Sequence, residues 1–334
     1  MKDEILSRIQ KKFPLVSKPF LVIAKELGTT EDEVLKILNE EKEANIIRQT
    51  SAIFDTKRLG YKSSLVAFQI APENIDAAVQ IINSHPGVSH NYERNHQFNI
   101  WFTMAVAPDS TLGLEKTIEI LAKLTKAQDY IMLPTLKLFK INVKLNTTGK
   151  DEKKEKVKKV IHSDIELTPL HHAIIQKAQY DIKFVSEPFK ELTEELNIDY
   201  EKFFAILQEL QEAGVMRRFA SILNHRKAGF NANAMVVWDV DEEKGEEIGE
   251  NAAAFSAVSH CYLRPKYANW PYNLFTMVHG KTTQETNAII DDMSKEIPSV
   301  SHMPLYSSRE FKKVRIEYFT SAFEAWEQEH KKIA

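Results

Sequence analysis

Cysteine is almost absent from this chain of 334 residues, which contains a single one, Cys261. One cysteine excludes an internal disulfide and any metal or iron–sulfur site built from cysteines alone. Long apolar runs are also absent, since none approaches the ~20 residues of a membrane-spanning helix. The first residues, MKDEILSRIQKKF, lack the apolar core of a signal peptide. We therefore expect a cytoplasmic protein without membrane contacts.

A strong excess of charge is lacking too, because the formal net charge is only −3. This near balance disfavours a protein whose main task is to coat a polyanion. The chain has no Gly-rich dinucleotide fingerprint, so nothing in it predicts a nicotinamide or flavin site. With 43% hydrophobic and 27% charged residues, it is typical of a soluble globular protein of two or three domains.

An internal repeat is the strongest pattern that the sequence does contain. SKPF at 17–20 recurs as SEPF at 186–189, and VSHNYERNHQFNIWFTMAV at 88–106 matches VSHCYLRPKYANWPYNLFTMVHG at 258–280. The chain is therefore predicted to consist of two homologous halves, the product of a gene fusion. The segment between them, NTTGKDEKKEKVKKVIHSD at 146–164, has the charge density of an exposed tether.

Each half divides into two predicted domains. Apolar spacing in the first half indicates helices at 2–12, 19–27 and 31–44, followed by a strand-like segment, as in a winged helix-turn-helix. Strand, helix, strand, strand, helix and strand follow at 63–70, 73–84, 88–94, 98–107, 112–124 and 130–143, which is the ferredoxin-like βαββαβ order. The prediction is an α+β protein with two tandem copies of this pair. The boundaries are 1–60 and 61–145 for the first half, 146–164 for the linker, and 165–229 and 230–334 for the second half, which ends in a helix.

This combination of domains resembles the leucine-responsive, or Lrp/AsnC, transcription regulators, and DNA binding is the function it first suggests. The charge of the two recognition-type helices opposes that function. Residues 29–44 hold six acidic side chains against two basic ones, and residues 197–214 hold four against one. DNA affinity depends on neutralising phosphates. We therefore expect no DNA binding, with a regulator kept as an alternative.

The two matched segments carry the residues that point to chemistry. Side chains two apart on a strand share a face and lie roughly 6.6 Å apart. The predicted faces are therefore His90, Tyr92 and Arg94 in the first half, and His260, Tyr262 and Arg264 in the second. Imidazole exchanges protons near neutral pH and can ligate iron, whereas arginine holds carboxylates in bidentate geometry. A structural role for these strand residues is the alternative.

At these residues the chain resembles the siroheme decarboxylases, Lrp-like enzymes whose two related subunits are here fused. The resemblance covers essentially the whole chain. It implies that the C12 and C18 acetate groups of siroheme lose carbon dioxide to give 12,18-didecarboxysiroheme, in heme d1 or alternative heme biosynthesis. It also implies no cofactor beyond the iron of the substrate. A tetrapyrrole-binding protein without catalysis is a further alternative.

The reaction that the resemblance implies suggests roles for particular residues of this sequence. The predicted proton donors are His260, Tyr262, His90 and Tyr92, with His260 or His90 as a possible axial ligand of the siroheme iron. The predicted substrate contacts are Arg264, Arg94, Arg48, Arg217, Arg218, His96, Trp270, Tyr272 and Asn273. Because the loop PKYANWPYN is richer than its counterpart NHQ, we expect one principal pocket around His260 and Tyr262, to which the first half contributes His90 or Arg94. The halves would form a pseudo-dimer, and further self-association or contacts with pathway enzymes stay open.

Overall fold

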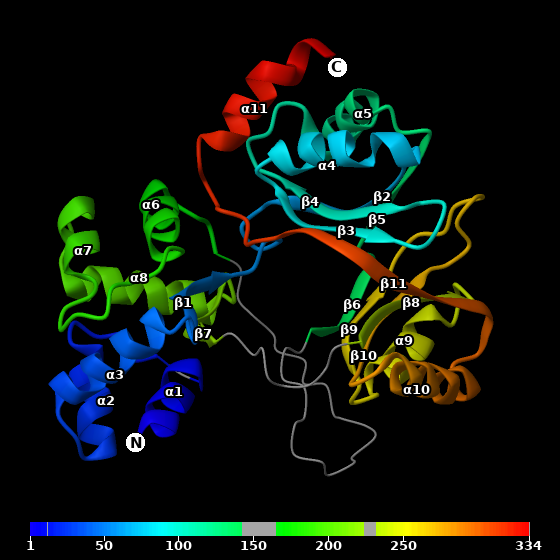
Figure 1. The fold of residues 1–334 in the computed structure, drawn as a ribbon. Coiled ribbons are helices and arrows are strands. Elements are labelled where there is room, and N and C mark those ends of the chain that lie inside the picture. Colours follow the sequence, from blue (N-terminus) through cyan, green and yellow to red (C-terminus); the bar gives the residue numbers. More distant parts are fainter. Residues whose placement is uncertain (12, 142–164, 224–231, 334) are drawn as a thin grey trace. The chain divides into compact units, whose positions relative to one another are not determined.

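The computed structural model describes residues 1–11, 13–141, 165–223 and 232–333, so the predicted tether at 146–164 lies outside the described residues (Figure 1). The chain divides into two compact units. The first combines Met1–Tyr61 and Val160–Arg226 with the short segment Glu317–Ser321, and the second contains the remainder. Each unit thus gathers equivalent segments of both halves of the repeat. The five domain boundaries that the sequence suggests stay a prediction.

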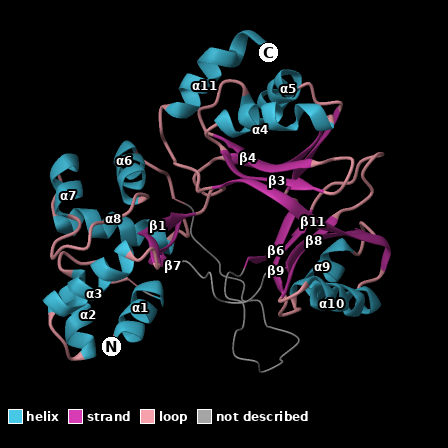
Figure 2. Ribbon diagram, viewed as in Figure 1, coloured by secondary structure: helices cyan, strands magenta, loops and turns pink. Residues whose placement is uncertain are grey.

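The first unit is mainly helical (Figure 2). Its elements are α1 (Lys2–Lys11), α2 (Pro19–Leu27), α3 (Glu31–Glu43), β1 (Ile47–Phe54), α6 (Pro169–Ala178), α7 (Lys190–Leu196), α8 (Tyr200–Glu212) and β7 (Met216–Leu223). Thr30 caps α3 by accepting the Glu33 N–H. The expected wing strand does not fold back within its own half, because β1 pairs antiparallel with β7. The hydroxyl groups of Thr50 and Ser221 meet there at 2.6 Å.

The second unit contains both ferredoxin-like domains, which confirms the predicted fold class. The first has β2 (Lys62–Gln69), η1 (Pro72–Asn74), α4 (Ile75–Ser84), β3 (Val88–Arg94), β4 (Ile100–Val106), α5 (Gly113–Thr125) and β5 (Asp129–Pro134). The second has β8 (Ala232–Val240), α9 (Gly245–Ala253), β9 (Val258–Leu263), β10 (Leu274–Gly280), α10 (Thr283–Glu296) and β11 (Ser299–Lys313). The helix α11 (Ala322–His330) and the turn η2 (Lys331–Ile333) follow. No helix among the described residues is long and apolar enough to cross a membrane.

The two halves exchange strands in this unit. The single strand predicted at 130–143 is instead two strands, β5 and β6 (Lys137–Ile141), and β6 pairs with β9 of the other half. Pro134 ends β5, and proline has no N–H with which to continue a ladder. The long strand β11 pairs first with β8 and then with β3. The strand order β5-β2-β4-β3-β11-β8-β10-β9-β6 therefore makes one sheet from both halves.

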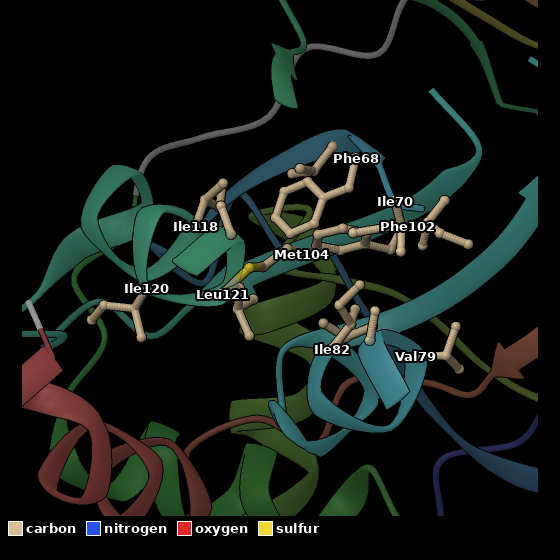
Figure 3. Close-up of a cluster of buried hydrophobic side chains, with 14 of the residues drawn as sticks. Phe68, Ile70, Val79, Ile82, Phe102, Met104, Ile118, Ile120 and Leu121 are labelled. Carbon is tan, nitrogen blue, oxygen red and sulfur yellow. The ribbon is translucent and has the colours of Figure 1, made fainter. Parts of the chain in front are cut away.

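Three apolar clusters hold the second unit together. Helices α4 and α5 cover one face of the first half's strands, where Phe68, Phe102 and Leu121 pack with their neighbours (Figure 3). Helices α9 and α10 cover the strands of the second half in the same way. On the other face of the strands, a third cluster joins the halves and includes Trp101 and Trp270. Each half therefore buries apolar surface that the other half covers.

His85 packs against the apolar cluster of the first half, and its burial predicts a loss of stability in acid. The ring is 1% exposed, accepts the Gly87 N–H at Nδ1 and packs edge-on against Trp326 of α11. Burial, with Lys312 and His330 nearby, lowers the pKa of His85 to about 3. The unfolded chain, with a pKa of about 6.5 at this residue, therefore binds the proton first as the pH falls.

Because the folded pKa is depressed, the contribution of His85 is complete above pH ~6.5 and is lost on acidification towards pH ~3. We expect about 2 kcal/mol of its contribution to the free energy of unfolding to disappear between pH 7 and pH 5. All four tryptophans lie in the second unit, so urea titrations followed by tryptophan fluorescence report on this unit alone. His85→Asn is expected to be less stable at pH 7 but to lose about 2 kcal/mol less on acidification. Equal losses in both proteins would contradict this.

Candidate active site

The two repeated strands β3 and β9 open onto one cavity of about 600 Å³ within the second unit. His90, Tyr92 and Arg94 line it from the first half, and the second half contributes the equivalent side chains. In each set the histidine ring stacks on the tyrosine ring, at 6.3 Å between centroids for His90 and Tyr92 and 6.2 Å for His260 and Tyr262. The spacing of two residues therefore places both sets as predicted, and both line this one cavity. Their catalytic roles stay a prediction.

A β-bulge shapes the histidine end of each strand. His260 pairs with Met277 of β10, and Val258 pairs with Val278, the next residue of β10. Ser259 is therefore the extra residue of β9. Ser89 takes the same place between Val88 and His90 in β3. A bulge turns its extra residue away from the normal alternation of a strand. Each serine hydroxyl consequently meets Nδ1 of the histidine that follows it, at 2.7 Å for His260 and 3.0 Å for His90.

Arg94 and Arg264 are buried cations that pair with no carboxylate of the described residues. They are only 6% and 8% exposed, and within the described residues neither guanidinium bonds to a carboxylate. Nη1 of Arg94 donates to the Leu305 carbonyl at 2.7 Å, and Nη1 of Arg264 donates to the Leu133 carbonyl. Nε of each is buried and has no hydrogen-bond partner in the described parts of the chain.

Burial lowers the pKa of both arginines to about 10, which still leaves them charged at neutral pH. Arg94 lies over the ring of Tyr92 and Arg264 over that of Tyr262, at 5.7 and 4.8 Å from the ring centroids. These cation–π contacts stabilise the charges but do not neutralise them. The cavity therefore holds two guanidinium groups that suit an anionic ligand.

The phenol of Tyr92 stays protonated at neutral pH. Burial, with the carboxylate of Glu310 close by, raises the pKa of Tyr92 to about 12, although Arg94 opposes this shift. Glu310 belongs to β11, and this strand forms a further wall of the cavity with Arg309, Glu310 and Lys313. Unlike Arg94, Arg309 is paired with carboxylates, donating from Nη1 to Asp76 at 3.1 Å and from Nε to Glu93. The first-half end of the cavity thus contains an acid beside a neutral phenol.

Comparisons with known proteins agree with this architecture. The model of the AsnC-like ligand binding domain matches residues 58–140 and 227–312, and that of the siroheme decarboxylase NirDL-like HTH domain matches residues 2–48 and 171–217. A siroheme decarboxylase of Hydrogenobacter thermophilus is 41% identical, over 98% of this chain and 97% of its own length. The chain belongs to the siroheme decarboxylase family. The prediction of a decarboxylating enzyme of this family is confirmed.

Other members of the siroheme decarboxylase family explain the repeat. A beta subunit from Methanosarcina barkeri is 40% identical over 94% of its own length but only 43% of this chain. One half of this chain thus corresponds in length to a whole subunit. A crystal structure of the siroheme decarboxylase NirDL in complex with an iron-uroporphyrin III analogue is 36% identical. The structural match covers 99% of this chain and 98% of the NirDL chain, with a TM-score of 0.81.

Several residues predicted to contact the substrate do not line the cavity. Arg48, Arg217 and Arg218 belong to the first unit, where Arg217 pairs with Asp55 at 2.8 Å. Their contact with a substrate stays a prediction. The other residues that lie outside the lining are His96, Trp270, Tyr272 and Asn273.

These four residues take structural positions in the second unit. Trp270, 1% exposed, belongs to the core between the halves, with Tyr272 packed against it. Asn273 accepts the Val240 N–H and donates to the Val240 carbonyl, and Nδ1 of His96 accepts the Phe98 N–H. The loop that carries Trp270 fastens the second half to the first, since Asn269 donates to Asp129 at 2.8 Å. Their proposed contact with substrate is not favoured by this placement.

Sequence reasoning missed part of the lining. The β11 residues Ser307–Glu310 and Lys313 reach the cavity only because this strand crosses to β3, and no local pattern signals that crossing. Ser259 and His279 also line the cavity, and each had a signal in the sequence that went unused. Ser259 belongs to the motif VSH, which occurs in both copies, and His279 lies next to the end of the second matched segment, in MVHG.

Proposed function

We propose that this chain removes the carboxyl groups of the C12 and C18 acetates of siroheme in the cavity between β3 and β9, giving 12,18-didecarboxysiroheme. The observation that carries the proposal is the pair of buried guanidinium groups, Arg94 and Arg264, without a carboxylate partner among the described residues. A buried charge is costly unless it is paired. A tetrapyrrole with carboxylate side chains supplies the missing anions.

The reaction gives the protein two tasks. Each acetate carboxylate leaves as carbon dioxide, and the CH₂ group left behind takes up one proton to become a methyl group. The conjugated macrocycle accepts the electron pair of the broken bond, so no nicotinamide, flavin or other cofactor is needed beyond the substrate's own iron. The protein therefore has to hold the carboxylates and deliver a proton to each carbon.

Histidine and tyrosine side chains on both walls can provide the protons. All four line the same cavity, so each can reach a bound substrate. We assign the main role to His260 with Tyr262 and a supporting role to His90 with Tyr92. Tyr92, with its raised pKa, serves better as a hydrogen-bond donor than as an acid that ionises. Binding of one imidazole to the substrate's iron is the competing role for His260 or His90.

The test is anaerobic incubation of the purified chain with siroheme, without nicotinamide or flavin, followed by mass spectrometry of the tetrapyrrole. The proposed enzyme releases two molecules of carbon dioxide per siroheme. A tetrapyrrole-binding protein without catalysis would return siroheme with its mass unchanged. Recovery of intact siroheme from a protein that binds it tightly would therefore defeat the proposal.

We further expect no specific DNA binding, despite the helix-turn-helix segments. Helix α3 begins Glu31-Asp32-Glu33, and its Glu41 is already used inside the unit, where it accepts from Lys2 at 2.9 Å. DNA phosphates would be repelled by such a helix. A mobility-shift titration with the protein's own promoter at low salt should show no shifted band. A band at nanomolar protein that survives competitor DNA would overturn this expectation.

A further inference from the structure

Among the described residues, the chain of polar contacts behind His260 continues through a serine to a second histidine, whereas the equivalent contacts behind His90 do not. Nδ1 of His260 lies 2.7 Å from Oγ of Ser259, which lies 2.6 Å from Nε2 of His279. Nδ1 of His279 lies 2.8 Å from Oδ1 of Asn233. Ser259 is 4% exposed, and within the described part of the chain its hydroxyl contacts only these two imidazoles.

The direction of every hydrogen bond in this chain follows from its last member. Oδ1 of Asn233 is a carbonyl oxygen and can only accept, so Nδ1 of His279 carries the hydrogen. Burial lowers the pKa of His279, which keeps its ring neutral and leaves Nε2 as an acceptor. The hydroxyl of Ser259 then donates to His279 and accepts from Nδ1–H of His260.

In the first half the equivalent series of polar contacts ends at a different residue. Equivalent backbone bonds, Ala105 N–H to Gly87 and His279 N–H to Ala257, show that Ala105 occupies the position of His279. Ser89 there meets the hydroxyl of Thr103 at 2.7 Å, and either oxygen can be the donor. That contact leaves both tautomers of His90 possible. These contacts therefore define a tautomer for His260 but not for His90.

We propose that His279 is a positioning residue, which acts through Ser259 to hold neutral His260 as its Nδ1–H tautomer. Nε2 is then the nitrogen through which His260 exchanges protons in the cavity. The consequence for catalysis rests on the proposed decarboxylation, whereas the tautomer itself does not. Orientation of a catalytic imidazole by a third group is the same arrangement that defines catalytic triads.

The test begins with the substrate-free protein labelled with ¹⁵N-histidine. Long-range ¹H–¹⁵N correlation spectra at a pH where the imidazoles are neutral distinguish the two tautomers directly. The His260 signals, assigned by their loss in His260→Gln, should show the Nδ1–H form. In His279→Ala or Ser259→Ala they should shift towards the Nε2–H form. Ser89→Ala is the matched control and should leave them unchanged.

Kinetics provide the second measurement. His279→Ala should lower kcat for siroheme decarboxylation about tenfold, as removal of a group that orients a functional imidazole commonly does, with KM little changed. His279→Gln should restore part of this loss, because its amide oxygen can accept the Ser259 hydroxyl. An unchanged His260 tautomer in His279→Ala overturns the positioning role. A shifted tautomer with unchanged kcat upholds that role and argues instead against His260 in the proposed reaction.

Discussion

His260→Ala is expected to slow both decarboxylations of siroheme by about 10²- to 10⁴-fold, the usual contribution of a general acid. The reason is that both histidine-bearing strands line one cavity and not two. A substrate that is repositioned in that cavity after the first step meets the same proton donor in the second. The matched variant His90→Ala should weaken binding or slow both steps by a smaller factor.

The competing account assigns one acetate to each half. On that account each variant stops at a different monodecarboxylated product. The two mono-products are isomers with the same mass, so the measurement requires chromatographic separation and NMR assignment of the remaining acetate. Accumulation of one defined mono-product by His260→Ala, at the normal rate of the first step, would contradict a single pocket.

Replacing Arg94 or Arg264 by alanine is expected to weaken siroheme binding by about 1.5–3 kcal/mol, or roughly 10- to 100-fold in Kd. Each guanidinium is charged, buried and without a carboxylate partner among the described residues, so a bound carboxylate would be its first counter-ion. The measurement is a siroheme titration followed by quenching of tryptophan fluorescence.

Arg309→Ala provides the matched control for the two arginine variants. Arg309 lines the same cavity, but Asp76 and Glu93 already balance its charge. Its loss should therefore change Kd by less than either buried arginine. Each buried arginine also donates to a backbone carbonyl of the other half, so urea unfolding of each variant must accompany the titrations. Equal Kd values for all three variants and the parent protein would remove both arginines from the site.

The sequence by itself determined the repeat, the domain types and the two faces that carry histidine, tyrosine and arginine. Repetition at a fixed spacing survives in the sequence as matched segments, and strand alternation is a local property, so both can be recognised without contacts. The family followed from the same segments. His90 and His260 were placed correctly on their strands because only the local backbone decides which face a side chain takes.

Only the tertiary structure decided how the two faces come to share one cavity, because that depends on pairings between residues far apart in the chain. The strand predicted at 130–143 is divided between two ladders, and β11 crosses to β3, which brings Glu310 next to Tyr92. Trp270 looked like a ligand platform in sequence, yet long-range packing buries it between the halves. The bulge at Ser259 likewise arises from its pairing partner, β10, and this pairing joins His279 to His260. Local sequence patterns decide which face of a strand a side chain takes, whereas the chemistry of this cavity depends on the residues that distant strands place across from it.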